Sequence, residues 1–356
     1  MKVHNFSAGP AILPATVLKK ASESALEYNE IGLSILEISH RSPAFVAILD
    51  EAVALVKELL SVPSDYEVLF LTGGASSQFY MTAMNLLNEQ ERAGYVDTGT
   101  WSTKAIKEAK HFGQIDVLAS SKESNFNYIP KDYEIPTDLR YLHLTSNNTI
   151  FGTQYQAWPD TKVPFVCDMS SDIFSRPIPI DRFDLIYAGA QKNLGPAGTT
   201  LVIVKKSILG RVERAIPTML DYQTHINKNS SFNTPPVYPI YVCKLTLEWI
   251  KSLGGLEAMA KRNQEKADLI YGAIDRLPMF KGTAAVEDRS KMNACFVLED
   301  DSLTKDFLQL CTDNGCSGVK GHRSVGGFRA SIYNAMDKES VQVLVDLMED
   351  FAQKRG

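Results

Sequence analysis

Cysteine is scarce in this chain of 356 residues, and its five cysteines are scattered. They stand at positions 167, 243, 295, 311 and 316, and no two of them form a CxxC motif. An odd number of separated cysteines argues against a disulfide framework and against a zinc site, and it is typical of reduced thiols in a cytosolic protein. We therefore expect a cytoplasmic protein that binds no metal.

Long apolar runs and an excess of basic residues are also missing. No stretch approaches the roughly 18 apolar residues of a membrane-spanning helix, and the first residues, MKVHNFSAGPAIL, lack the apolar core of a signal peptide. The formal net charge is -5, whereas proteins that bind nucleic acids usually present basic faces. We expect neither a membrane nor a nucleic acid as a partner.

Short apolar runs alternate with helical stretches over the first two thirds of the chain. Each run is followed by a polar or glycine-rich turn. The runs are YEVLFL (66–71), AGYV, LRYLHL, VPFVC and DLIYAG. This alternation indicates a mainly parallel sheet with helices on both faces. In such sheets the ligand lies beyond the carboxyl ends of the strands, so these turns predict the site.

Helix signals and a change of pattern suggest the domain limits. Ser42 and Pro43 predict a helix start, and Gly254-Gly255 divides a long helical stretch. Further on, strand and helix patterns mix. We expect an α/β protein with a large domain over residues 16–256 and a smaller α+β domain over residues 257–356, on which residues 1–15 pack.

One predicted strand runs into a turn that carries a lysine, YAGAQKNLGPAG (187–198). An isolated Lys192 would most simply reach solvent, because burying an unpaired ammonium is costly. Asp168, however, directly follows a neighbouring predicted strand, which places both side chains in one crevice. Pyridoxal phosphate (PLP) needs such a pair, an amine for its Schiff base and a carboxylate that keeps its ring nitrogen protonated. A helix N-cap or a salt bridge with Lys192 is the alternative role for Asp168.

Other turns at the same edge suit the rest of this cofactor. TGGASSQF (72–79) opens a helix whose first N–H groups favour an anion such as the PLP phosphate, with Ser76 as a further donor. Glycine-rich turns more often only redirect the chain. Trp101 is placed to stack on the ring or to lie in the core. Thr149 is placed to contact the phenolic oxygen or to form a simple polar turn.

Cationic residues gather in two further places. The segment 319–331, VKGHRSVGGFRAS, contains His322, Arg323 and Arg329 and no carboxylate, and Arg41 follows a histidine just before a predicted helix. A single arginine is usually a solvated surface charge. Histidine and arginine together in glycine-rich loops favour recognition of small anions, since guanidinium forks bind carboxylates and phosphates. We expect a substrate with more than one negative group.

Long motifs then identify a family. The chain resembles the class V, fold-type I aminotransferases that depend on PLP, and among them those that form phosphoserine. The similarity covers nearly the whole length and includes NFSAGPAILP, EISHRS, LTGGASSQF, SSDIFSRPI, YAGAQKNLGPAG, FNTPP and KGHRSVGGFRASIYNA. It implies transfer of the amino group from L-glutamate to 3-phosphohydroxypyruvate, which gives O-phospho-L-serine and 2-oxoglutarate. A related step of PLP synthesis stays open.

The resemblance also implies roles for individual residues. Lys192 corresponds to the Schiff-base lysine and proton shuttle, and Asp168 to the partner of the ring nitrogen. The other implied cofactor contacts are Ala75, Ser76, Trp101, Thr149 and Gln191. Asn233 and Thr234 correspond to residues that reach the cofactor of a second subunit, which implies a homodimer with shared active sites. The implied substrate contacts are Arg329 for the α-carboxylate, and Arg41, His322 and Arg323 for the phosphate or the glutamate side chain.

Two other functions compete with the aminotransferase function that the resemblance implies. Another class V enzyme, such as an alanine–glyoxylate type aminotransferase or a cysteine desulfurase, would share the fold. A desulfurase needs a reactive thiol on a loop, for which only Cys311 and Cys316 qualify by position. A cofactor-free anion-binding protein would have no use for Lys192 opposite Asp168, and it would be colourless.

Overall fold

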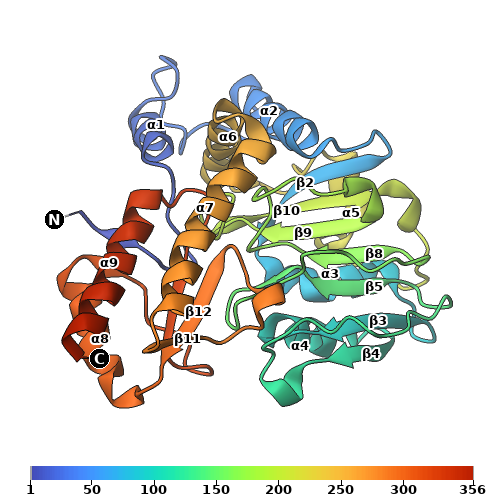
Figure 1. The fold of residues 1–356 in the computed structure, drawn as a ribbon. Coiled ribbons are helices and arrows are strands. Elements are labelled where there is room, and N and C mark those ends of the chain that lie inside the picture. Colours follow the sequence, from blue (N-terminus) through green and yellow to red (C-terminus); the bar gives the residue numbers. More distant parts are fainter. Residues whose placement is uncertain (1, 356) are drawn as a thin grey trace.

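The computed structural model describes residues 2–355, and its centre is one sheet of seven strands (Figure 1). The strands are β2 (Tyr66–Gly73), β3 (Arg92–Asp97), β4 (Gln114–Ser120), β5 (Leu142–Thr145), β8 (Phe165–Asp168), β9 (Leu185–Gly189) and β10 (Gly198–Lys205). Their order in space is β2-β10-β9-β8-β5-β3-β4. Only β10 runs antiparallel to its neighbours. The predicted mainly parallel sheet is therefore confirmed.

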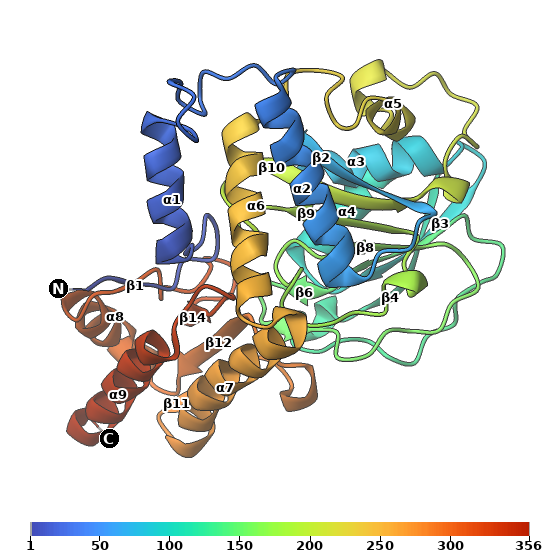
Figure 2. The same ribbon diagram turned by 90° about the horizontal axis from the view of Figure 1, so that it is seen from above.

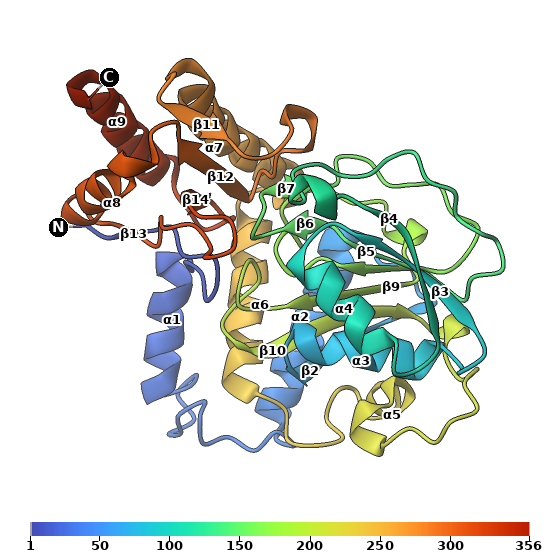
Figure 3. The same cartoon turned by 90° about the horizontal axis from the view of Figure 1, so that it is seen from below.

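Helices cover both faces of this sheet (Figures 2 and 3). One face carries α2 (Pro43–Leu60) and α6 (Val237–Ser252), with α1 (Ala15–Leu26) beside α6; the other carries α3 (Ala75–Leu86), α4 (Thr100–Ala109) and the short α5 (Tyr222–Asn227). Along β2, Val68 and Phe70 pack into the core beneath α2 and α6, whereas Leu69 and Leu71 pack into the opposite core. Alternate side chains thus point to opposite faces of the sheet, and both faces are buried from solvent. This burial explains the uninterrupted apolar runs of the sequence.

A second, smaller region follows in the C-terminal part of the chain. It contains α7 (Gly255–Arg276), α8 (Thr304–Asp313), α9 (Lys338–Arg355) and an antiparallel sheet of β11 (Phe280–Gly282), β12 (Asn293–Leu298) and β14 (Phe328–Ser331). It has its own core of phenylalanines. Near the N-terminus, β1 (His4–Asn5) pairs with β13 (Cys316–Ser317), and Phe6 is fully buried in this core.

The division of the chain at residue 257 stays a prediction. Helix α7 contributes Met259 to the core of the large sheet and Ile270 to the smaller core, so one rigid helix passes from one region to the other. The helix starts are explained by local chemistry. The Ser42 hydroxyl accepts the Phe45 N–H at 3.4 Å, and Gly254 adopts a left-handed φ of 100° before α7 begins.

Some elements had no prediction from the sequence, among them α1, β4 and β11. No helix within residues 2–355 has both the length and the apolar character needed to cross a membrane. All five cysteines are buried and free.

Candidate active site

The carboxyl ends of the parallel strands meet at one edge of the large sheet. In the register of the sheet, Thr145 of β5 lies opposite Asp168 of β8, and Asp168 lies opposite Tyr187 of β9. Strand β2 runs parallel to β9, since both are antiparallel to β10. The turns that carry the predicted site residues therefore leave the sheet on the same side.

Lys192 lies in the turn that follows β9. Its Nζ donates to the Thr149 hydroxyl at 2.7 Å and lies 5.1 Å from the centre of the Trp101 ring. Removal from water lowers the pKa of the Lys192 ammonium to about 8, although the charge of Asp168 opposes this shift. The amine is therefore much closer to its neutral, nucleophilic form at physiological pH than an ordinary lysine.

Asp168 is the last residue of β8 and is 4% exposed. One carboxylate oxygen accepts the Ser170 N–H at 2.9 Å and the Ser170 hydroxyl at 2.6 Å. Burial raises the pKa of Asp168, while the positive charge of Lys192 opposes the rise. Such a carboxylate can hold a cationic N–H group, because that contact returns part of the lost solvation.

The N-terminus of α3 forms an open anion position beside β9. Gly74 occupies the N-cap without any side-chain cap, and the first turn has no carboxylate. A Cβ atom on Gly189 would lie 2.8 Å from Oε1 of Gln191 and 3.3 Å from the backbone nitrogen of Ala75. Gln191 and Ala75 therefore converge on one point, and Ser76 is exposed next to it. Free N–H groups at a helix N-terminus favour a phosphate.

Trp101 lies in the first turn of α4 and is half-buried. Lys104 Nζ lies 4.9 Å from the centre of its ring, in addition to Lys192. The Nε1–H group is buried without a hydrogen-bond partner among residues 2–355. The ring borders the space around Lys192, where it can stack on a planar ligand.

The hairpin of β6 (Asn147–Asn148) and β7 (Thr153–Gln154) links this edge to the smaller region. At its turn, the Thr149 hydroxyl accepts from Lys192, and the Thr149 carbonyl accepts from Nη1 of Arg329 at 3.3 Å. Arg329 lies on β14, and its buried Nε has no partner within the described chain. The structure therefore brings Lys192, Asp168, Thr149 and Arg329 together from two regions.

The other cationic candidates are held less tightly. His322 Nδ1 and the Ser324 hydroxyl are 2.7 Å apart, and Arg323 is exposed. The pKa of His322 is lowered, first by burial and then by the charges of Arg329, Arg323 and Lys104. Loop 319–327 thus brings its positive charge to the same place as Arg329 and α4.

Arg41, Asn233 and Thr234 are exposed on two loops, one before α2 and one before α6. No hydrogen bond joins their side chains to the residues around Lys192 within the part of the chain that the structure describes. Phe232, next to Asn233, is 42% exposed although it is large and apolar. The implied roles of these three residues stay predictions.

Sequence reasoning missed several residues at this edge. Ser170 and Asp172 follow β8 directly, and the polar run DMSSD was the available signal. Tyr333 donates its hydroxyl to the carbonyl of Ala8 at 2.8 Å. A Cβ on Gly9 would lie 3.3 Å from Cγ of Lys192. The start of the chain therefore closes over the lysine, which no local pattern indicates.

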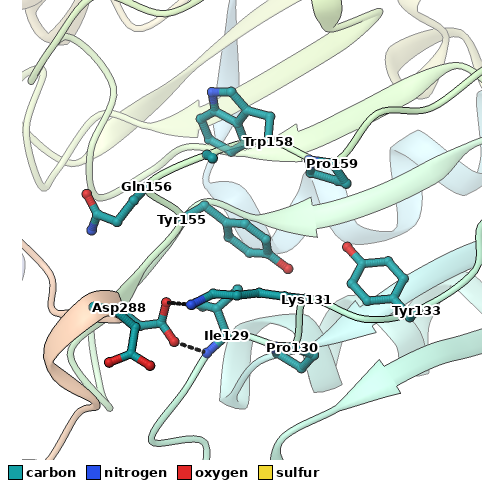
Figure 4. A pocket seen from close by; sticks show the side chains of 11 residues that line it. Ile129, Pro130, Lys131, Tyr133, Tyr155, Gln156, Trp158, Pro159 and Asp288 are labelled. Carbon is teal, nitrogen blue, oxygen red and sulfur yellow. Dashed lines mark hydrogen bonds and ion pairs between the residues drawn. The ribbon is translucent and has the colours of Figure 1, made fainter.

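A separate cavity of about 360 Å³ lies where η5 (Val286–Asp288) meets loops of the large region (Figure 4). Tyr155 and Trp158 line it, and Asp288 pairs with Lys131 Nζ at 3.0 Å. None of the predicted site residues lines this cavity. Its ion pair joins the smaller region to the large one.

The residues at the sheet edge fit PLP. The open N-terminus of α3 suits the phosphate, the Trp101 ring suits the pyridine face, and Asp168 suits the ring nitrogen. The Lys192 amine, with its lowered pKa, suits the aldehyde carbon. The orphaned Nε–H of Arg329 and Nε1–H of Trp101 are donors that a ligand would satisfy.

Comparisons with known proteins show the family of the chain. The family model "Aminotransferase class-V" matches residues 3–344, and the chain belongs to that family. Among its curated relatives are phosphoserine aminotransferases. That of Flavobacterium psychrophilum is 58% identical over 99% of this chain and 100% of its own, and that of Bacteroides fragilis is 56% identical over 99% of both. The solved phosphoserine aminotransferase of Bacillus circulans has a TM-score of 0.97 at 48% identity, covering 100% of this chain and 99% of its own.

Proposed function

We propose that this chain catalyses PLP-dependent transfer of the amino group between L-glutamate and 3-phosphohydroxypyruvate, which yields O-phospho-L-serine and 2-oxoglutarate. The observation that carries the proposal is the Lys192 amine beside the buried carboxylate of Asp168, at the carboxyl edge of the sheet. Identity of 55–59% to full-length phosphoserine aminotransferases supports the substrates.

When bound, PLP supplies the electron sink that makes the Cα–H of the amino acid acidic. Lys192 Nζ then takes this proton and returns it, which its lowered pKa favours. Asp168 would keep the ring nitrogen protonated, and the Thr149 hydroxyl accepts from the free Lys192 amine and orients it. Trp101 and the first turn of α3 would hold the ring and the phosphate in place.

The cationic residues supply substrate recognition in this proposal. Arg329 presents a planar fork that suits the α-carboxylate. Arg41, His322 and Arg323 receive the phosphate of one substrate and the side-chain carboxylate of the other. Because the segment 319–331 has no carboxylate, no negative charge within it competes with the substrate.

We extend the proposal to a cytoplasmic homodimer. Asn233 and Thr234 are exposed and lack partners around Lys192, which fits residues that serve the cofactor of a second subunit. The exposed Phe232 beside them would be covered in such a pair. Analytical ultracentrifugation tests this part: a dimer is expected, and a monomer that retains full activity would refute it.

The desulfurase alternative is not favoured. It needs an accessible thiol of low pKa, but burial raises the pKa of Cys311 to about 12 and that of Cys316 to about 11. All five cysteines are buried. A desulfurase also has no use for a set of phosphate-binding cations.

The decisive assay is glutamate-dependent transfer to 3-phosphohydroxypyruvate, with wild type compared with Lys192→Ala. We expect yellow wild-type protein that turns over, and a variant that loses turnover. Lys205→Ala, at the opposite end of the neighbouring strand, is the control and should keep wild-type activity. Turnover of Lys192→Ala at anything near the wild-type rate would refute the assignment. The four-carbon 3-hydroxy-2-oxo-4-phosphobutanoate, offered as a second acceptor, tests the related step of PLP synthesis.

A further inference from the structure

A second buried carboxylate, Asp172, lies close to the candidate lysine and has no part in the function proposed above. It is 6% exposed and follows β8 by four positions. Its hydrogen-bond partners among the described residues are two neutral side chains, and the charge of Arg176 offsets only part of the effect of burial, which raises the pKa of Asp172. Keeping a carboxylate ionised in such surroundings costs free energy of folding. We therefore expect a role for its charge or its geometry.

The partners of Asp172 stand at the two ends of the β6–β7 hairpin. Oδ1 accepts the hydroxyl of Ser146, directly before β6, and Oδ2 accepts Nε2 of Gln154, the last residue of β7, at 3.0 Å. Ser146 also donates its N–H to the carbonyl of Asp168 at 2.9 Å, and its hydroxyl oxygen lies 3.0 Å from the same carbonyl. One side chain thus fastens both ends of the hairpin to the strand end that carries Asp168.

The turn of the same hairpin carries Thr149, which contacts Lys192 through its hydroxyl and Arg329 through its carbonyl. The hairpin lies between the large sheet and β12 (Figure 3), and Asn147 bonds across to Asn293 at 2.8 Å. A hairpin fixed at both ends can hold its turn in one place, and small displacements of reacting groups cost much rate.

We propose that Asp172 is a positioning residue that clasps both ends of the β6–β7 hairpin and so presents Thr149 to Lys192 and Arg329. The charge of Asp172 also favours the ammonium form of Lys192, in the same direction as that of Asp168 but more weakly. The inference rests on the proposed function only in naming Lys192 as the reacting lysine.

A double-mutant cycle tests the clasp. Asp172→Asn keeps the shape of the side chain, but an amide accepts hydrogen bonds through one oxygen instead of two. It therefore cannot accept from both ends of the hairpin, and we expect kcat to fall about tenfold. In a Thr149→Val background the same change should cost less than in wild type, because the turn has already lost its contact with Lys192 and keeps only the carbonyl contact with Arg329. Ser146→Ala, a small change that is easier to tolerate, should lower kcat in the same direction. Independent, multiplicative losses would overturn the proposal, as would wild-type kcat in both single variants.

A pH titration of the absorbance of bound PLP separates this role from general loss of structure. Asp172→Asn should move the midpoint down, since the variant removes a negative charge that favours the ammonium form of Lys192. Ser146→Ala keeps the charge and should leave the midpoint unchanged. Asp184→Asn, which removes a carboxylate at the opposite edge of the sheet, is the control. If wild type takes up no PLP, the proposed function fails; if wild type titrates and Asp172→Asn matches it, the inference fails.

Discussion

The carboxyl edge of the large sheet and the cationic loop of the smaller region hold their charges in different ways. At the sheet edge, Asp168 and Lys192 are hydrogen-bonded to neighbours in the chain, and burial raises the pKa of Asp168 and lowers that of Lys192. In the loop, Arg323 is exposed and the side chain of His322 bonds to a nearby serine. In the proposed function, the first arrangement fixes reacting atoms, and the second leaves positive charge available for a substrate anion.

The residues proposed for the reaction and those proposed for substrate recognition therefore lie in two separate parts of this molecule. Buried residues on strand ends gain precision from the register of the sheet. Exposed cations gain little from the fold and much from a ligand, since their charges are screened until a substrate is bound. Changes at the edge should therefore act on kcat, and changes in the loop on KM.

The largest effect is expected for Asp168→Ala. Loss of the carboxylate removes the group that keeps the ring nitrogen protonated, and kcat should fall by about a hundredfold to a thousandfold. Steady-state kinetics with saturating PLP measure this loss. Ser170→Ala, which removes only a hydroxyl that bonds to Asp168, is the matched control and should cost far less. A change confined to KM would contradict the expectation that substitutions at the sheet edge act on kcat.

Arg329→Lys comes next. A lysine keeps the charge but cannot form the fork to a carboxylate, so the KM for glutamate should rise about tenfold to a hundredfold. The kcat should change less than KM, although the contact between Arg329 and the Thr149 carbonyl makes some loss of kcat expected. Initial rates over a range of glutamate concentrations decide this; an unchanged KM would contradict the role given to Arg329.

The pH dependence of PLP uptake by the cofactor-free protein is a smaller effect. Only the neutral amine of Lys192 can attack the aldehyde, and its pKa is lowered to about 8. The uptake rate should therefore rise about tenfold between roughly pH 7 and pH 9 and then level off. A rate that still climbs steeply above pH 10, as for an unperturbed lysine, would show that burial does not shift this amine.

The smallest effect is expected for His322→Gln. The pKa of His322 is lowered by burial and by the neighbouring cations, which favours the neutral imidazole, so the change to glutamine removes little positive charge. We expect less than about a threefold change in KM for phosphoserine near pH 7. Arg323→Ala, which does remove a charge, should raise the same KM more. Equal effects of the two variants would contradict the expectation that KM depends more on charge than on hydrogen bonding in this loop.

Much of the fold followed from local patterns. Apolar runs such as 66–71 and 185–189 predicted strands because both faces of the sheet are buried. Ser42 and Gly254 predicted helix limits through capping chemistry. The direction of β10 is set by its pairing with two distant strands, which no local pattern encodes. Likewise, β4 is half-buried at the sheet edge and shows only a weak apolar pattern.

The candidate site shows the same limit. Asp168, Lys192 and Thr149 were accessible from the sequence because each directly follows a buried strand or lies in a turn at its end. Asp172 and Gly9 were not, because their importance depends on contacts between segments far apart in the chain. The roles of the exposed Arg41 and Asn233 remain predictions, because no hydrogen bond joins their side chains to the residues around Lys192 within residues 2–355.

The proposed division is between a sheet edge that sets the rate and a cationic loop that binds the substrate. Its most direct test is a single turnover of PLP-loaded enzyme with excess phosphoserine. For Asp168→Asn, we predict a saturating rate constant at least about a hundredfold below wild type, with a half-saturating concentration within about threefold. For Arg323→Ala, we predict a half-saturating concentration about tenfold higher, with a saturating rate constant within about threefold. The reverse pattern, in which the loop variant loses rate and the edge variant loses only affinity, would contradict the account.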